Sequence, residues 1–323
     1  MRKNTLVKLL ILAVCTCVAI LLSLFYGGSE CIGNGSEASA YILYEIRLPK
    51  TLTAIVAGSA LALAGLVLQT IFRNPLAGPY VLGISSGASV MVALALLAGT
   101  GLSFFAGRAF IVVAAVSGSL IVTALILAIS RKVSNNVILL LIGLMIAQIC
   151  GAVELALEYF ADPGRLKTFV LWGMGSLSST NNADLFVFVP VVVLSAAALL
   201  FYIKPLNAML LGEDYARSAG IHYSSSRFGL ILFSSLITGV TTAFCGPLAF
   251  IGTAVPILSR LIFKTSRQQV HVLGCMLIGS TLLLFADFAS HSMIKNMVLP
   301  VNMITTLIGA PIVIYLMFKN KYW

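Results

Sequence analysis

The sequence predicts an all-α integral membrane protein with about ten transmembrane helices and both termini in the cytoplasm. Of its 323 residues, 60% are hydrophobic and 9% are charged, and the mean hydropathy is +1.06. A soluble domain is usually about 45–50% apolar and about 25% charged, so this chain cannot cover itself with polar surface. The composition therefore excludes a soluble enzyme. It equally excludes a disordered chain, which needs low hydrophobicity.

Apolar runs of about 20 residues, long enough to cross a bilayer, recur along the whole chain. Charged residues, proline or asparagine separate them. Eight runs are clear: residues 5–26, 51–72, 81–99, 109–130, 136–158, 185–203, 227–248 and 301–318. Two more are less clean, because residues 249–263 are short and contain Pro256, whereas residues 270–290 carry Asp287. Counting both gives ten spans.

Two segments are interpreted by their length. The run at 5–26 follows basic residues as a signal peptide does, but it is long enough to span and no small-x-small cleavage site clearly ends it. We therefore expect a retained first helix. Residues 169–177 (FVLWGMGSL) are too short to cross, and we expect a short helix or re-entrant piece beside a cavity. No large soluble domain fits between the spans, so residues 1–323 form one predicted transmembrane domain.

The positions of the charges give the chain its direction. With the N-terminus inside, the inner loops hold 14 of the 20 Lys and Arg residues and the outer loops hold 6. Of the 10 acidic residues, only Glu213 and Asp214 fall inside. Cytoplasmic loops carry an excess of Lys and Arg, and the opposite orientation violates this rule at nearly every short loop. The net charge of +10 is thus mainly an orientation signal, and no nucleic-acid partner is expected.

No catalytic or metal-binding constellation is visible in the sequence. The six cysteines lie mostly in apolar runs without a CxxC pair, which is typical of small buried hydrophobes. His222, His271 and His291 are far apart and fall on opposite sides of the predicted membrane, whereas a triad or metal site needs convergence. We expect no enzymatic activity and no bound cofactor or metal in this chain; a membrane-embedded enzyme is the weaker alternative.

Ionisable residues inside spans are costly and are candidates for function. Glu154 and Glu158 are four residues apart and share a helix face. They either line a substrate path or reach the outer interface, where Arg165 or Lys167 could pair with them. The polar Gln69 is either a path residue or an interhelical hydrogen bond.

Asp287, His291 and Lys295 also share one helix face, near the outer end of their span. A local ion pair at the outer mouth is the simpler interpretation. Neither this set nor the two glutamates form a proton relay through the bilayer, which argues against an ion-coupled secondary transporter.

Residues 205–223 (PLNAMLLGEDYARSAGIHY) form the longest inner stretch between spans. Apolar residues, two acids and one arginine alternate there between two glycines, which suits a short amphipathic helix at the inner surface. Such a helix could dock into a cytoplasmic partner. A merely solvated loop is equally compatible with the pattern.

Residues 47–90 resemble a known family. They read RLPKTLTAIVAGSALALAGLVLQTIFRNPLAGPYVLGISSGASV, and they closely resemble the second and third helices of FecCD-type permeases, the membrane subunits of ABC importers for iron–siderophore, haem and cobalamin. The shared motifs are R-L-P-[RK]-T, N-P-L-A and L-G-[IV]-S-x-G-A. Further matching segments follow in the family's order at residues 172–177, 211–217, 246–252 and 299–311, so the resemblance covers nearly the whole chain.

The resemblance implies ten helices per subunit in the cytoplasmic (inner) membrane, surrounded by lipid. It implies a second permease subunit, either identical or closely homologous, around a central path. Two cytoplasmic ATPases that use ATP and Mg²⁺ would drive transport, and an extracytoplasmic binding protein would deliver the ligand. The segment LWGMGSL favours an iron–siderophore complex as substrate, with haem second and cobalamin third.

The resemblance also suggests site residues. The positions matching the family's ATPase-coupling segment are Gly212, Glu213, Ala216, Arg217 and Gly220. The positions matching its docking site for the binding protein are Arg47 and Lys50, with His291 where relatives have an arginine and Lys295 one turn further on. Arginine suits bidentate pairing with a partner's carboxylate. The candidates for the substrate path are Gln69, Glu154, Glu158, Trp172 and Met174.

Overall fold

The computed structural model describes residues 3–26, 40–97, 108–133, 135–293 and 298–319. Within these ranges the regular elements are all helical, and no strand occurs. The helices are α1 (Lys3–Tyr26), the π-helical turn η1 (Ile42–Arg47), α3 (Leu48–Phe72), α4 (Ile84–Leu97), α5 (Arg108–Ser130), α6 (Asn136–Tyr159), α7 (Pro163–Gly173), α8 (Asn182–Phe201), α9 (Ile203–Met209), α10 (Glu213–Ser218), α11 (Tyr223–Cys245), α12 (Ile251–Phe263), α13 (Gln268–Ser292) and α14 (Val301–Lys319).

The predicted number of spans agrees with these helices. Seven of the described helical segments are long and apolar enough to cross a membrane: α1, η1 with α3, α5, α6, α8, α11 and α13. Three shorter apolar helices, α4, α12 and α14, bring the number of apolar helices, though not of full-length spans, to ten. The segment predicted at 169–177 is helical only in its first half, where it completes α7.

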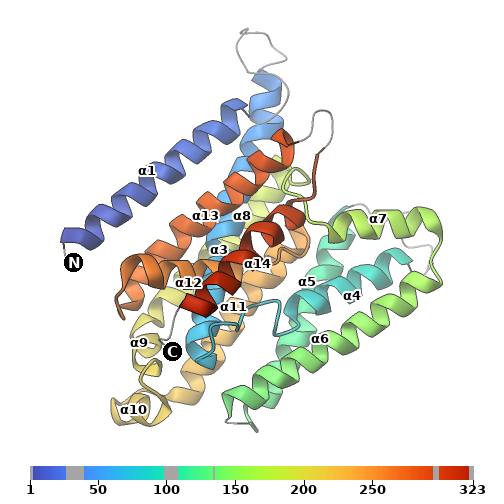
Figure 1. The fold of residues 1–323 in the computed structure, drawn as a ribbon. Coiled ribbons are helices and arrows are strands. Elements are labelled where there is room, and N and C mark those ends of the chain that lie inside the picture. Colours follow the sequence, from blue (N-terminus) through green and yellow to red (C-terminus); the bar gives the residue numbers. More distant parts are fainter. Residues whose placement is uncertain (1–2, 27–39, 98–107, 134, 294–297, 320–323) are drawn as a thin grey trace.

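Helix α3 lies at the centre of the molecule (Figure 1). It packs against α8, α11, α12 and α13, while α1 lies outside α13 and exposes most of its apolar side chains. A second group consists of α4, α5, α6 and α7. It joins the first group where α5 packs against α11. This arrangement makes α3 the element that touches most other parts of the chain.

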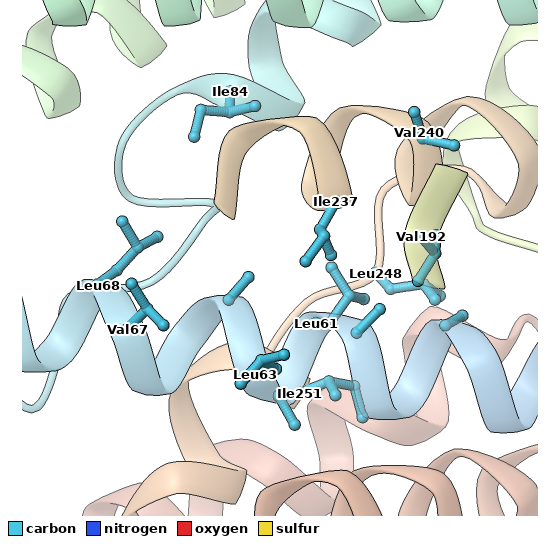
Figure 2. Close-up of a cluster of buried hydrophobic side chains, with 14 of the residues drawn as sticks. Leu61, Leu63, Val67, Leu68, Ile84, Val192, Ile237, Val240, Leu248 and Ile251 are labelled. Carbon is cyan, nitrogen blue, oxygen red and sulfur yellow. The ribbon is translucent and has the colours of Figure 1, made fainter. Parts of the chain in front are cut away.

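The core runs along α3. Figure 2 shows its apolar side chains facing those of α8, α11 and α12. The labelled residues Leu61, Leu63, Leu68, Val192, Ile237 and Ile251 are each no more than 4% exposed. Dense interdigitation of this kind is what the interior of a folded protein requires.

Small residues let the neighbours of α3 approach its backbone. A Cβ atom on Gly58 would lie 2.3 Å from the carbonyl oxygen of Gly279 in α13. A Cβ atom on Gly65 would lie 1.7 Å from the carbonyl oxygen of Gly252 at the start of α12. Close approach through small residues is a common way for helices to associate in membranes. These two contacts fix α3 against α13 and α12.

The loops gather at two opposite ends, in the alternation that the sequence predicts. At one end Arg73 donates to the carbonyl of Leu210, and Arg227 donates to that of Val133. We call this end, which carries α9 and α10, the inner end. At the other end, the outer end, the Arg47 guanidinium donates to the carbonyl of Leu24. The start of α1 and the end of α14 both point towards the inner end (Figure 1). That this end faces the cytoplasm stays a prediction from the charges.

Helix α12 is too short to span. Its 13 residues extend about 20 Å at about 1.5 Å per residue, against about 30 Å for the hydrocarbon core. The chain before it is therefore recessed from the outer surface. There the Ser176 amide donates to Cys245 O at 2.9 Å, and the Ala249 amide to Asn302 Oδ1 at 2.9 Å. We call residues 174–178, 246–250 and 298–302 the loop junction. Irregular backbone at membrane depth is tolerated where it is buried in protein or lines a cavity.

Candidate coupling segment, outer ion pair and transport path

The inner segment predicted at 205–223 contains two short helices, α9 and α10, and the turn between them. Gly212 occupies that turn with φ of +120°, a conformation that side-chain-bearing residues rarely adopt. A Cβ atom there would also lie 2.6 Å from Nη2 of Arg73. Both observations explain why glycine stands at this position.

Arg73 connects the coupling segment to the core. It ends α3 in a left-handed conformation, with φ of 47°. Its Nη2 donates to the carbonyl oxygen of Leu210 at 3.3 Å, two residues before Gly212. In the sequence Arg73 is only one of the 14 basic residues predicted on the inner side. Its position directly after a long span indicated a helix end at the membrane surface. The sequence could not show its hydrogen-bond partner, Leu210, which lies 137 residues away.

The residues of α10 divide into an anchored side and a presented side. Ala216 is fully buried, and Gly220 ends the helix with φ of +78°. Arg217 and Glu213 form an ion pair at 2.6 Å, with side chains 65% and 30% exposed. The predicted amphipathic helix therefore exists, held by Ala216 and presenting its charged residues.

Two exposed apolar residues of this segment were missing from the predicted set. Leu211 is 64% exposed and Tyr215 is 51% exposed. They flank Glu213 in the sequence, so α10 presents a mixed apolar and charged surface beyond the inner end of the bundle (Figure 1). Their signal in the sequence was a large side chain on either side of the two acidic residues, Glu213 and Asp214.

The outer end holds a second ion pair of a different kind. Lys50 Nζ lies 2.9 Å from Asp287 Oδ2, and the two side chains are only 3% and 1% exposed. Lys50 belongs to the first turn of α3, and Asp287 lies near the end of α13, so the pair fastens these helices together. Arg47 is 5% exposed, and its Nη1 donates to Leu24 O at 2.9 Å.

The docking role of Arg47 and Lys50 stays a prediction, and the structure shows both side chains buried. Neither cation forms part of an exposed surface in this structure, because both are turned into contacts within the chain. The sequence showed two cations at an outer helix start, but it could not show the carboxylate and the carbonyl that face them. The principal partner of Asp287 is thus Lys50, which lies far away in the sequence. The local partner predicted for it, His291, has its ring Nδ1 3.7 Å from the carboxylate.

His291 remains at the outer mouth. Its ring Nδ1 is 2.9 Å from the carbonyl oxygen of Asp287 and 3.7 Å from the Asp287 carboxylate. Its side chain is 17% exposed and borders a cavity of about 260 Å³. Lys295, predicted as its companion, lies outside the described residues.

Two predicted path residues flank the loop junction. Met174 is 42% exposed and borders the same cavity as His291. Trp172 borders a neighbouring cavity of about 280 Å³, and its indole Nε1 is buried without a hydrogen-bond partner. Its ring stacks on Phe169, with 6.2 Å between centroids. An unsatisfied indole N–H beside a cavity is a group that a passing ligand could contact.

Glu154 and Glu158 lie in α6, away from the loop junction. Glu154 is half-buried, and its Oε1 has no hydrogen-bond partner. Among the described residues neither glutamate forms an ion pair with Arg165 or Lys167. The structure therefore does not show the ion pair suggested as the alternative for these glutamates. Their role in a substrate path stays a prediction.

Of the two roles considered for Gln69, the structure shows the interhelical hydrogen bond. Its side chain is 1% exposed. The amide nitrogen donates to Pro75 O at 2.6 Å and to Thr253 O at 3.0 Å, and the amide oxygen accepts from Arg260 Nη1 at 2.8 Å. Through these three hydrogen bonds Gln69 joins α3 to α12 and to the turn after α3.

Comparison with known proteins agrees with this architecture. The FecCD transport family matches residues 6–319 of the chain. The chain belongs to the FecCD transport family. Its relatives include the hemin transport system permease protein HmuU of Yersinia pestis, which is 34% identical over 88% of this chain and 86% of that protein. The vitamin B12 import system permease protein BtuC of Salmonella paratyphi A is 34% identical over 97% of this chain and 95% of that protein.

Solved structures give the same fold. A metal-chelate type ABC transporter in an inward-facing conformation superimposes with a TM-score of 0.87 at 29% identity, covering 97% of this chain and 99% of that one. The PsaBC structure from Streptococcus pneumoniae has a TM-score of 0.62 at 15% identity, which shows a shared fold alone. As a FecCD permease of the ABC importer type, the chain is a multi-pass protein of the cytoplasmic membrane.

Proposed function

We propose that this FecCD permease carries an iron–siderophore complex across the cytoplasmic membrane by alternating access, driven by a partner ATPase. The observation that carries the proposal is the match of residues 6–319 to the family, combined with a projecting α10 that is anchored through Arg73 to the central helix. Haem and cobalamin are the competing substrates, because two relatives are named for hemin and vitamin B12 transport.

The inner surface of α10 is the proposed contact with the ATPase. Leu211 and Tyr215 supply apolar area, while Glu213 and Arg217 supply charge. An interface needs a desolvated apolar centre and a polar rim, and this segment offers both. Two ATPase subunits would use ATP and Mg²⁺, one under each of two permease subunits.

Helix α3 is the proposed connection between the two ends. At its inner end Gln69 and Arg73 hold α12 and the coupling turn. At its outer end Lys50 holds α13 through Asp287. A push on α10 would reach α3 through the Arg73–Leu210 hydrogen bond, and α3 would carry it to the outer ion pair as a packed, rigid element.

An extracytoplasmic binding protein is the proposed outer partner. His291 lies one helical turn from Asp287 and borders the outer cavity. A partner seated there would contact α13 beside the Lys50–Asp287 pair. Ligand released from it would meet Trp172 and Met174 at the loop junction. A second permease subunit, identical or homologous, would complete the path.

Uptake into proteoliposomes tests the proposal. The permease is reconstituted with its ATPase and binding protein, and uptake of a ferric siderophore, haem and cobalamin is compared. The proposal predicts ATP-dependent uptake of the siderophore complex, abolished when the ATPase is catalytically dead. Preference for haem or cobalamin would correct the substrate. Uptake that follows an ion gradient without ATP would show a secondary transporter.

A further inference from the structure

A third cavity, rich in arginine, lies at the inner end, beside the coupling segment and apart from the loop junction. It has a volume of about 810 Å³ and lies between the end of α5 and the start of α11. Three arginines, Arg131, Arg217 and Arg227, and His222 contribute to its lining, and none of its lining residues is Asp or Glu. The cavity is therefore strongly biased towards an anion.

Arg227 has hydrogen-bond donors that no other residue satisfies. Its side chain is 5% exposed, and only Nη1 has a hydrogen bond, to Val133 O at 3.3 Å. Its Nε and Nη2 atoms are buried without a hydrogen-bond partner. A buried guanidinium with unused donors is costly. An oxyanion in the cavity that Arg227 lines would satisfy them with charge-assisted hydrogen bonds.

The start of α11 adds independent support. This helix runs for 23 residues from Tyr223, and no side chain caps its first turn. The first amides of a helix have no partner within the helix, and its N-terminal end carries partial positive charge. Ser224 and Ser225 of that turn also line the cavity. Helix starts of this kind bind phosphate groups.

Two further arginines, Arg131 and Arg217, lie at the more exposed side of this cavity. Arg131 is held over the ring of Phe228, with its Cζ 5.4 Å from the ring centroid. Arg217 is 65% exposed and pairs with Glu213, the carboxylate next to the cavity. These two arginines can approach an anion from solvent while Arg227 contacts it from within the protein.

We propose that this cavity binds the phosphate of an anionic phospholipid headgroup. The cavity lies where two membrane-spanning helices, α5 and α11, end and begin, which is the depth at which lipid phosphates lie. Basic pockets between transmembrane helices on the cytoplasmic side bind such headgroups. Since Arg217 belongs to both the cavity and the coupling segment, a bound lipid would fix α10 against α11.

Another inner cavity provides a matched control. It has a volume of about 710 Å³ and is lined by Lys8, Lys264 and Arg267. It is basic as well, but it contains no buried arginine; Arg267 is exposed. Removing Arg267 takes away one positive charge from the same end of the bundle without touching the proposed site.

The test measures binding of phosphatidylglycerol to the purified permease alone, by native mass spectrometry and by thermal unfolding in phosphatidylcholine nanodiscs with and without phosphatidylglycerol. Arg227→Gln is expected to weaken binding at least tenfold and Arg131→Gln about threefold. Arg267→Gln is expected to stay within twofold of the unaltered chain. Because neither ATPase nor substrate is present, the result does not depend on the proposed transport function.

Other outcomes would overturn the proposal. Equal weakening by Arg267→Gln and Arg227→Gln would show unspecific attraction of charge. Stabilisation by inorganic phosphate in phosphatidylcholine alone, as large as that by phosphatidylglycerol, would show that a free anion occupies the cavity. If Arg227→Gln fails to fold, phosphatidylglycerol binding is compared between Arg131→Gln and Arg267→Gln. Equal binding by these two variants would also refute the proposal. Loss of ATPase assembly in Arg227→Gln without any lipid effect would assign the cavity to a partner's carboxylate.

Discussion

Two ion pairs at opposite ends of the molecule differ in their exposure and in the elements that they join. Lys50 and Asp287 are 3% and 1% exposed, whereas Arg217 and Glu213 are 65% and 30% exposed. The outer pair joins two long helices that are far apart in sequence. The inner pair joins two residues one turn apart on a short helix. One pair therefore holds the bundle together, and the other forms part of a surface.

The difference shows where each pair can act. Breaking a buried pair leaves an uncompensated charge and costs about 3–5 kcal/mol, whereas an exposed pair contributes about 0–1 kcal/mol. The outer pair thus stabilises the fold. A partner that binds at the outer end must leave this pair intact or replace the stabilisation that is lost. The inner pair has little structural effect, so its charges are available to a partner.

The largest expected effect comes from breaking the outer pair. Lys50→Met leaves the Asp287 carboxylate buried beside an apolar side chain, and we expect a loss of about 3–5 kcal/mol of stability. Unfolding of the purified permease in detergent, followed by circular dichroism, measures this. The double variant Lys50→Met with Asp287→Leu should recover most of the loss. A double variant as unstable as the single one would show that packing, and not charge, holds this site.

A smaller effect is expected at the inner turn. Gly212→Ala places a Cβ atom at φ of +120° and 2.6 Å from Arg73 Nη2, so we expect a loss of about 1–3 kcal/mol together with weaker transport. Gly220→Ala is the matched control, because φ there is +78° but no atom lies within 4 Å of its Cβ position. Equal transport in the two variants would argue against the Arg73 contact as the connection.

The smallest effect on stability is expected at the inner pair itself. Glu213→Gln removes the pair but leaves the side-chain size unchanged, and we expect a change of at most about 1 kcal/mol. The same unfolding assay measures it, next to Lys50→Met. A loss as large as that of Lys50→Met would contradict the distinction between the two ends.

Patterns local in sequence were enough for the helices, the number of spans and the position of the coupling segment. Apolar runs define helices in lipid, and the charges between them define alternating ends. The partners of Lys50, Gln69 and Arg73 could not be predicted, because most of them lie far away in sequence. Arg260, for example, is 191 residues from Gln69. A sequence shows that a polar residue is present in a span, but only the folded chain shows whether another residue already uses it.

The central claim is that the exposed surface of α10 receives the force of the ATPase. The most direct measurement compares ATP-dependent uptake and ATPase stimulation of the reconstituted complex with Glu213→Lys against the unaltered permease, with Tm measured on the same samples. The account predicts that uptake and stimulation fall at least tenfold while Tm stays within a few degrees. Unchanged uptake and unchanged stimulation in a folded Glu213→Lys complex would contradict it.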